Sequence, residues 1–189
     1  MARILDCGAG IGRITTSLLT TLATTTDIVE PIAKFAQVLI DSPLKQKGQV
    51  GDVWIQGLES FEPPSDGRKY DVIWNQWCLG HLTDRQLVEW LRKAGRCLRG
   101  YGDGADDGEK KQEEDDGGEG KGWIMVKENL CTGAFGGDIF DEQDSSVTRS
   151  DESFKRLFEE AGLRIVRQEL QTGFPKVLYP VKMYALRPK

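Results

Sequence analysis

A glycine-rich turn after the first apolar run of the chain is the first feature with a chemical use. Gly8, Gly10 and Gly12 alternate along this turn, and a helical pattern follows it. Glycines let a backbone approach a ligand closely, and the N-terminus of a helix offers unpaired N–H groups. Glu30 ends the second strand-like run, where a carboxylate can accept hydrogen bonds from both hydroxyls of a ribose. Together these features predict a site for a nucleoside-bearing cofactor.

The spacing of the glycines distinguishes between two kinds of cofactor. A dinucleotide-binding turn has the pattern GxGxxG, whereas this turn reads GxGxG, with Arg13 where the last glycine should fall. An acidic residue just before the turn, here Asp6, fits S-adenosylmethionine enzymes better. A plain tight turn is the simpler interpretation, but it leaves Asp6 and Glu30 without a role. We therefore predict a site for S-adenosylmethionine.

A second group of polar and aromatic residues follows the fourth strand-like run. Gln76, Trp77 and His81, the only histidine of the chain, stand there. Ligands of open α/β sheets bind at the carboxyl ends of the strands, which is where this group belongs. The simpler interpretation makes Trp74 and Leu79 core residues and lets His81 cap a turn. We accept it for Trp74 and favour a substrate-facing role for Trp77 and His81.

A third group is acidic and lies beyond the fifth strand-like run. Asn129 ends that run, and Asp141, Asp144 and Ser146 follow in a short polar segment. Carboxylates on this sheet edge could bind a cation or deprotonate an ammonium group. An acidic loop in which Asp144 or Ser146 caps a helix explains the same residue types. Composition alone leaves these two interpretations even.

Strand-like and helix-like patterns alternate along the chain, which predicts an α/β fold with a mostly parallel sheet. The helix after Pro31 has Phe35, Val38 and Leu39 as its predicted inner face, and Thr83 is the expected N-cap of a long helix. The last two strands are expected to close the sheet as an antiparallel pair. The expected strands span 3–7, 27–30, 50–56, 70–74, 123–127, 163–170 and 179–186, and the helices 13–24, 84–98 and 151–161.

Length and charge restrict the classes of protein that the chain can belong to. We expect one domain over residues 1–189, interrupted by an acidic, glycine-rich, disordered insertion at 101–122. The insertion carries nine acidic and three basic residues, a local charge of −6. Since the whole chain has a net charge of −5, the other residues sum to +1. That balance argues against nucleic-acid binding through bulk positive charge. A solvated charge run is the default interpretation of the insertion, and a partner-binding or regulatory segment is the alternative.

The cysteines and the apolar runs indicate whether the chain can bind zinc, span a membrane or belong to a reducing compartment. Four cysteines without CxxC spacing and a single histidine make a zinc site improbable. No apolar run is long enough to span a bilayer, and no signal peptide is recognisable. We expect free thiols in a reducing compartment, and therefore a protein of the cytoplasm and nucleus.

Taken together, the motifs resemble those of the protein N-terminal methyltransferases. The resemblance is carried by the runs at 5–15, 76–84 and 144–149, and it extends from residue 3 to about residue 187. It implies a Rossmann-like class I methyltransferase fold with a seven-stranded sheet. It also implies transfer of methyl groups from S-adenosylmethionine to the α-amino group of proteins that begin X-Pro-Lys.

The resemblance also implies a role for each matching residue. Catalytic roles, as handlers of the proton of the α-amine, fall to Asp144 and His81. The cofactor-binding residues are Gly8, Gly10, Arg13, Glu30, Leu58, Glu59 and Gln76. The substrate-binding residues are Trp77 against the proline, Asn129 at the first residue, Asp141 at the lysine, Ser146 beside it, and Tyr179 along the groove. Glu30 and Glu59 depart from the residues that the family more often carries.

One further departure concerns the start of the chain. The family carries a helical segment before the first strand, which covers the cofactor, whereas this chain begins two residues before that strand. We therefore expect a truncated chain with weakened cofactor binding. Two other functions stay open: a small-molecule or side-chain methyltransferase with the same cofactor loop, and a catalytically silent peptide-binding module.

Overall fold

Strand β1 (Arg3–Cys7) is an inner strand of the sheet, and residues 4–7 of it are buried on both of its faces. Leu5 and Cys7 pack into the main core on one side, while Ile4 and Asp6 point to the other side. The structure is a computed structural model that describes residues 1–101, 121–131, 137–173, 175 and 177–189.

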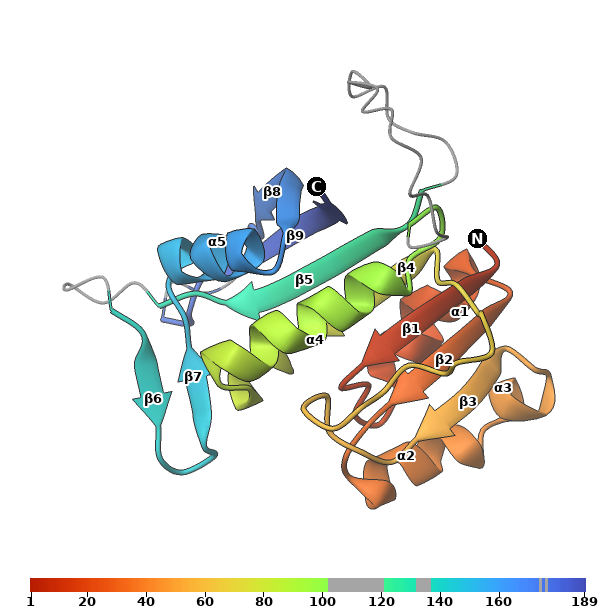
Figure 1. Cartoon of the computed structure of the whole chain (residues 1–189). Coiled ribbons are helices and arrows are strands. Elements are labelled where there is room, and N and C mark those ends of the chain that lie inside the picture. Colours follow the sequence, from red (N-terminus) through yellow and green to blue (C-terminus); the bar gives the residue numbers. More distant parts are fainter. Residues whose placement is uncertain (102–120, 132–136, 174, 176) are drawn as a thin grey trace, which may run out of the picture.

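The sheet has seven strands in the order β3-β2-β1-β4-β5-β9-β8 (Figure 1). The first five pair in parallel, and β9 runs antiparallel to both β5 and β8. This confirms the predicted α/β class, with its mostly parallel sheet and antiparallel end. The other strands are β2 (Thr25–Val29), β3 (Val50–Trp54), β4 (Val72–Gln76), β5 (Trp123–Asn129), β8 (Leu163–Leu170) and β9 (Val181–Pro188).

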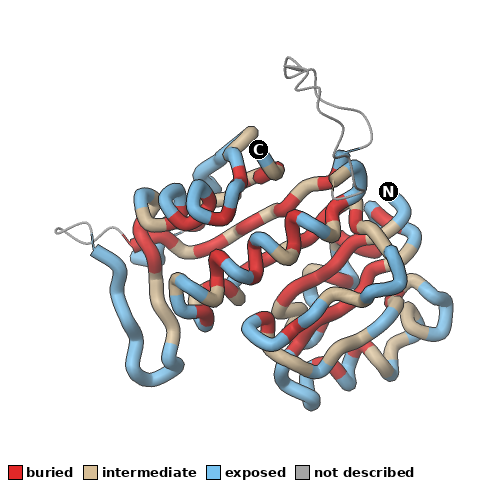
Figure 2. Tube along the Cα trace, viewed as in Figure 1, coloured by how far each residue is buried: buried red, intermediate tan, exposed pale blue. Residues whose placement is uncertain are grey.

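Helices cover the two faces of this sheet unequally. The main core lies between the sheet and α4 and α5, and Figure 2 shows buried residues along the central strands and the inner side of α4. On the other face, η1 and α1 cover Ile4, whereas Trp74 and Met125 line an open apolar hollow. The helices are η1 (Thr15–Leu19, a π-helix), α1 (Thr20–Leu22), α2 (Ala33–Ile40), α3 (Pro43–Gln46), η2 (Leu79–His81, a 3-10 helix), α4 (Asp84–Arg96) and α5 (Asp151–Glu160).

Helix α4 fixes the end of β4, which leads into the candidate site. Thr83 begins the helix as predicted, in a capping box with Gln86, whose backbone N–H it accepts and whose side chain it contacts. Farther along, the indole N–H of Trp90 donates to Oδ1 of Asn75 at 2.9 Å inside the core. Because Asn75 precedes Gln76 in β4, this bond fixes the strand just before the predicted substrate residues.

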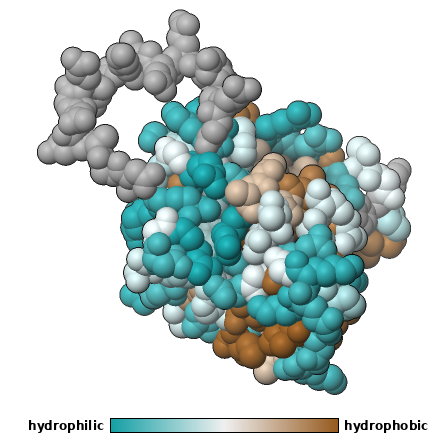
Figure 3. Space-filling model, turned by 90° about the vertical axis from the view of Figure 1, so that its right-hand side faces the viewer, coloured by the Kyte–Doolittle hydropathy of each residue, from teal (hydrophilic) through white to brown (hydrophobic). Residues whose placement is uncertain are grey.

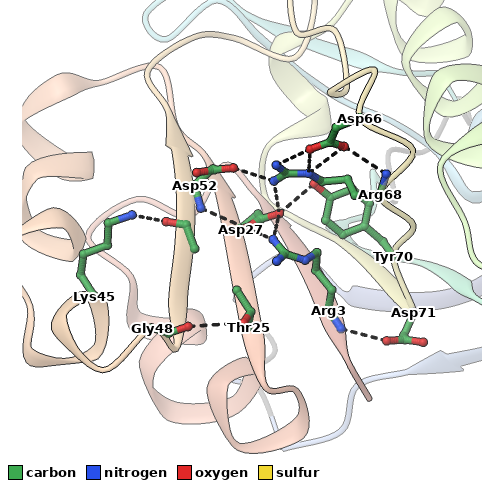
Figure 4. A network of polar contacts seen from close by, with 11 residues as sticks. Arg3, Thr25, Asp27, Lys45, Gly48, Asp52, Asp66, Arg68, Tyr70 and Asp71 are labelled. Carbon is green, nitrogen blue, oxygen red and sulfur yellow. Dashed lines mark hydrogen bonds and ion pairs between the residues drawn. The ribbon is translucent and has the colours of Figure 1, made fainter.

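A buried carboxylate, Asp27, ties three parts of the chain together (Figure 4). It accepts hydrogen bonds from Nη1 of Arg3 at 2.7 Å, from Nη1 of Arg68 at 3.1 Å and from the hydroxyl of Tyr70 at 3.0 Å. Burial, together with the charge of Asp27, raises the pKa of Tyr70 well above its ordinary value. Arg68 and Tyr70 lie near the end of the segment that connects β3 to β4, so the network holds that end in place. The same segment carries the predicted cofactor residues Leu58 and Glu59 near its beginning.

A short antiparallel hairpin stands apart from the main sheet. It consists of β6 (Ile139–Asp141) and β7 (Ser146–Thr148) and contains the predicted acidic segment. Sequence patterns did not indicate these strands, because three residues each are too few for an alternation to be visible. The helix cap considered for this segment is wrong, since Ser150 caps α5 by accepting from the N–H of Ser153.

The predicted insertion at 101–122 lies outside the described residues, apart from its first residue and its last two. Those ends join α4 to the beginning of β5, on the edge of the sheet opposite to the carboxyl ends of the strands. Among the described helices, none is both long and apolar enough to cross a membrane.

Candidate active site

The glycine turn after β1 has the conformation that its sequence predicts. Gly8, Gly10 and Gly12 all have positive φ angles, of +66°, +59° and +83°. A Cβ on Gly8 would lie 2.4 Å from the Cβ of Cys78, and one on Gly12 would lie 2.4 Å from Leu39, whereas Gly10 faces open space. Two of the glycines are therefore required by the packing of the protein, and the middle one lies where a ligand can approach.

Glu30 supports this turn from the end of β2. Its side chain is buried, and its two carboxylate oxygens accept from the backbone N–H groups of Gly10 at 2.7 Å and Ile32 at 2.9 Å. Each carboxylate oxygen has a second lone pair that can accept from a hydroxyl. The carboxylate can thus shape the turn and still bind a ribose, which remains the predicted role.

Asp6 is a buried carboxylate in β1, two residues before the first glycine of the turn. It accepts from the hydroxyl of Thr15 at 2.5 Å. Burial raises its pKa to about 7, the bond from Thr15 opposes the rise, and the nearby charge of Glu30 adds to it. Because Asp6 lines a hollow, a cation that enters the hollow would favour its charged form.

Two adjoining hollows run along the carboxyl ends of the central strands and share Gly8 and Trp77. One lies over α2 and is lined mostly by apolar residues, and the other lies between η1 and β4. Six of the seven predicted cofactor residues line them, and the seventh, Gly10, lies in the turn between. The first is lined by Gly8, Glu30, Leu58 and Glu59, and the second by Gly8, Arg13 and Gln76.

Helix α2 contributes a residue to the first hollow that the helical pattern placed elsewhere. Phe35 and Val38 were expected on the inner face of α2, but they are 36% and 50% exposed, and only Leu39 of the three is buried. Phe35, with Ile32, lines the hollow instead. Seen from the side of β3 and α2, the surface is mostly hydrophilic with an apolar patch at its lower end (Figure 3). The apolar residues of α2 are therefore divided between the core, which buries Leu39, and the hollow, which Phe35 lines.

A third hollow continues from the first and shares Trp77 and His81 with it. It brings together five predicted residues from the loop after β4, from β5 and from the hairpin, which lie up to 69 positions apart in the sequence. The indole N–H of Trp77 donates to Oδ1 of Asn129 at 3.2 Å, and Lys127 lies 5.9 Å from the centre of the Trp77 ring. The predicted residues that line it are Trp77, His81, Asn129, Asp144 and Ser146.

Two predicted substrate residues lie outside the lining of this hollow. Tyr179 is exposed on the segment before β9, and Asp141 is exposed at the end of β6. One oxygen of Asp141 accepts from the N–H of Gln143, and one oxygen of Asp144 accepts from the N–H of Ser146, so both carboxylates shape the hairpin turn. Both carboxylates thus have a structural role in the turn, and the same side chains are the ones predicted to bind the substrate or its proton.

Sequence reasoning gave no role to two buried charges at the third hollow, Glu128, which lines it, and Arg149. Glu128 lies on β5 among core residues, and burial raises its pKa to about 7, against hydrogen bonds from Leu79 and Cys78 and the charge of Arg149. The strict alternation of buried residues in β5 could have placed Glu128 inward, since Ile124 and Val126 share its face. Arg149 ends the run 144–149 that carries the family resemblance, but its sequence context does not indicate what it binds.

The sheet order, the glycine turn with its acidic partners and the hollow across the carboxyl ends of β1 and β4 define an S-adenosylmethionine-dependent methyltransferase. Comparison with known proteins then specifies the family. The chain belongs to the AdoMet dependent proline di-methyltransferase family, which it matches over residues 1–104 and 115–187.

Relatives from several organisms agree with this assignment. The chain is 43% identical over 184 residues to "Alpha N-terminal protein methyltransferase 1" of Schizosaccharomyces pombe. It is 39% identical over 183 residues to "N-terminal Xaa-Pro-Lys N-methyltransferase 1" of Danio rerio. Each match covers 97% of this chain and 71% of the relative. The chain spans only 58% of the length of the Arabidopsis thaliana relative.

Solved structures place the fold in the same class. A SAM-dependent methyltransferase of Leishmania major has a TM-score of 0.78 and 35% identity, and the match covers 99% of this chain and 65% of that one. A glycopeptide N-methyltransferase, with a TM-score of 0.72 at 10% identity, shares the fold alone.

Proposed function

We propose that this protein transfers methyl groups from S-adenosylmethionine to the α-amino group of proteins that begin Xaa-Pro-Lys. The observation that carries the proposal is the continuity of the three hollows. Trp77 lines all of them, so a ligand over the glycine turn and a peptide at the hairpin would meet at one side chain. The names of the relatives support this choice of substrate.

The residues around the first two hollows fit the chemistry of the cofactor. The open space at Gly10 admits a ligand to the turn, and the buried carboxylate of Glu30 can accept from ribose hydroxyls. Leu58 offers an apolar contact for a base, and Arg13 offers a cation for a carboxylate. When bound, the cofactor supplies an electrophilic methyl group on a sulfonium centre.

The residues of the third hollow suit the recognition and deprotonation of an amine. An α-amino group has a pKa of about 7.7–8.0, so a modest base is enough to free its lone pair near neutral pH. Asp144 and His81 are the proposed bases, and Asn129 is the proposed partner of the first residue of the substrate. Trp77 provides a flat apolar wall for the proline.

The third residue of the substrate and the rest of the groove involve the hairpin and the segment before β9. Asp141 is the proposed partner of the substrate lysine, with Ser146 beside it, because a carboxylate on an exposed strand end can pair with an ammonium group. Tyr179 is proposed to line the outer part of the groove. One shape contact and one charge contact would then read the second and third residues.

Mass spectrometry of peptides tests this function directly. A peptide that begins with Xaa-Pro-Lys should gain methyl groups when it is incubated with this chain and S-adenosylmethionine, and the same peptide with an acetylated α-amine should gain none. Methylation of the acetylated peptide would instead indicate a side-chain methyltransferase. Binding of the peptide without turnover would indicate a silent peptide-binding module.

We also propose that the protein works in the cytoplasm and nucleus. Cys7, Cys78 and Cys97 are free thiols, which is the usual state of cysteine in a reducing compartment. Imaging of the tagged full-length protein in its own cells would test this location.

A further inference from the structure

The loop of residues 77–82, which links β4 to α4, begins with a strained residue. Trp77 has a φ angle of +53°, in the left-handed region that bulky side chains rarely adopt. Its side chain is nevertheless 44% exposed and lines all three hollows. A conformation of this kind persists only where the surroundings hold it in place.

Glu128 binds the N–H groups at the start of the 77–82 loop. One of its carboxylate oxygens accepts from the backbone N–H of Cys78 at 2.9 Å and from that of Leu79 at 3.0 Å. The N–H of Trp77 itself donates to the backbone carbonyl of Lys127 at 3.1 Å. Three consecutive N–H groups of the loop are thus bonded to the end of β5.

Arg149 binds the carbonyl groups of the same loop. Its guanidinium donates to the carbonyl of Leu79 at 3.0 Å and to that of Leu82 at 2.6 Å. The Nε–H of Arg149 donates to Oδ1 of Asp84 at 3.1 Å, and this bond orients the planar guanidinium group. The side chain of Arg149 is only 1% exposed, so this arrangement replaces water around a full charge.

We propose that Glu128 and Arg149 are positioning residues that hold the 77–82 loop from opposite sides, so that Trp77 and His81 face the peptide. The inference rests on the proposed function, because it assigns a purpose to the loop within that site. Arg149 is not expected to touch the peptide, since it is spent on backbone carbonyls and on Asp84. Glu128 lines the third hollow, but the oxygen that carries its proposed role is bonded to the two loop N–H groups. A misplacement of about 1 Å at a reacting group can cost about a hundredfold in rate.

The test compares Glu128→Leu with two less disruptive variants. Leucine removes the acceptor, so kcat/KM for an Xaa-Pro-Lys peptide should fall about a hundredfold. Glutamine keeps a carbonyl oxygen that can accept both N–H groups, so Glu128→Gln should stay within about threefold of the wild type. Arg149→Lys keeps the charge but loses the fork, and should lose about tenfold.

A matched control separates positioning from general destabilisation. Val126→Ala removes core volume on the same face of β5, so it should lower Tm but leave kcat and KM within about twofold. In a Trp77→Ala background, Glu128→Leu should cost less than it does in the wild type, because one of the two residues that it positions is already gone. Amide hydrogen exchange in residues 78–82 should quicken at least about tenfold in Glu128→Leu and Arg149→Lys, but not in Val126→Ala.

The inference is overturned if exchange in residues 78–82 is unchanged in both variants, or if their losses are fully additive with Trp77→Ala. It is also overturned if Glu128→Gln loses as much as Glu128→Leu, because the carboxylate would then act by its charge. Should Glu128→Leu fail to fold, Arg149→Lys carries the same comparison. A wild-type protein that neither binds nor methylates the peptide refutes the proposed function, and hydrogen exchange then decides on its own whether the two residues hold the loop.

Discussion

Replacing Gly8 by alanine tests how tightly the cofactor turn is packed, with Gly10→Ala as a matched control. Both glycines have nearly the same backbone conformation, with φ angles of +66° and +59°. A Cβ at Gly10 would meet nothing within 4 Å, whereas a Cβ at Gly8 would lie 2.4 Å from the Cβ of Cys78. The two variants therefore differ in steric contact and hardly at all in backbone strain.

The expected magnitudes follow from these two terms. A left-handed conformation costs an L residue about 1–2 kcal/mol relative to glycine, which is the whole expected loss for Gly10→Ala. Overpacking adds about 1–3 kcal/mol, so Gly8→Ala should lower the free energy of unfolding by about 2–5 kcal/mol. For a chain of this length, each kcal/mol corresponds to about 2–4 °C in Tm.

Urea unfolding of the single and double variants measures both terms. The clash involves the Cβ of Cys78, so Cys78→Gly should remove the excess loss of Gly8→Ala, whereas Cys78→Ala should not. Equal losses for Gly8→Ala and Gly10→Ala would refute the argument. So would an excess loss that persists in the Gly8→Ala/Cys78→Gly protein relative to Cys78→Gly alone.

Three other predictions concern the carboxylates of the site. Glu30→Ala should weaken binding of S-adenosylhomocysteine at least about tenfold by calorimetry, since a charged hydrogen bond contributes about 1.5–3 kcal/mol; unchanged affinity would contradict the ribose role. Asp144→Asn should lower kcat with saturating peptide, and full turnover would exclude it as the base. Asp6 has its pKa raised from 3.8 to about 7, so the folded state binds more protons in this window and is destabilised as the pH rises. Urea unfolding at pH 5 and pH 8 should show a smaller decline in Asp6→Asn than in the wild type, by about 2–3 kcal/mol.

Local patterns were enough to predict the sheet and the cofactor turn. The first strand was predicted with its observed bounds, and Thr83 was correctly predicted as the cap of α4, because both depend on neighbours in the sequence. The fourth strand was predicted two residues too early, since Tyr70 forms only an isolated bridge to Leu98 before the strand begins. The sequence pattern does not reveal this difference, because Tyr70 is as suitable for a strand as the apolar run at 72–74 that follows it.

Features that depend on distant contacts could not be predicted in the same way. The strained backbone of Trp77 depends on partners about 50 residues away, on β5. Phe35 has a helical spacing typical of a core position, yet it lines a hollow, because the inner side of α2 needs only its small and aliphatic residues. The roles assigned to individual site residues through the resemblance remain predictions.

The position of β1 has a consequence for how the protein is made. This strand is synthesised before both of its neighbours in the sheet, β2 and β4, and the N–H of Arg3 bonds to Asp71, 68 residues further along. At about 5–20 residues per second, a ribosome needs roughly 3–14 s to produce that partner. Until then, one edge of a largely buried strand lacks its hydrogen-bonding neighbour, and such edges readily pair with other chains. The nascent protein is therefore expected to depend on chaperones during this interval more than the finished enzyme does.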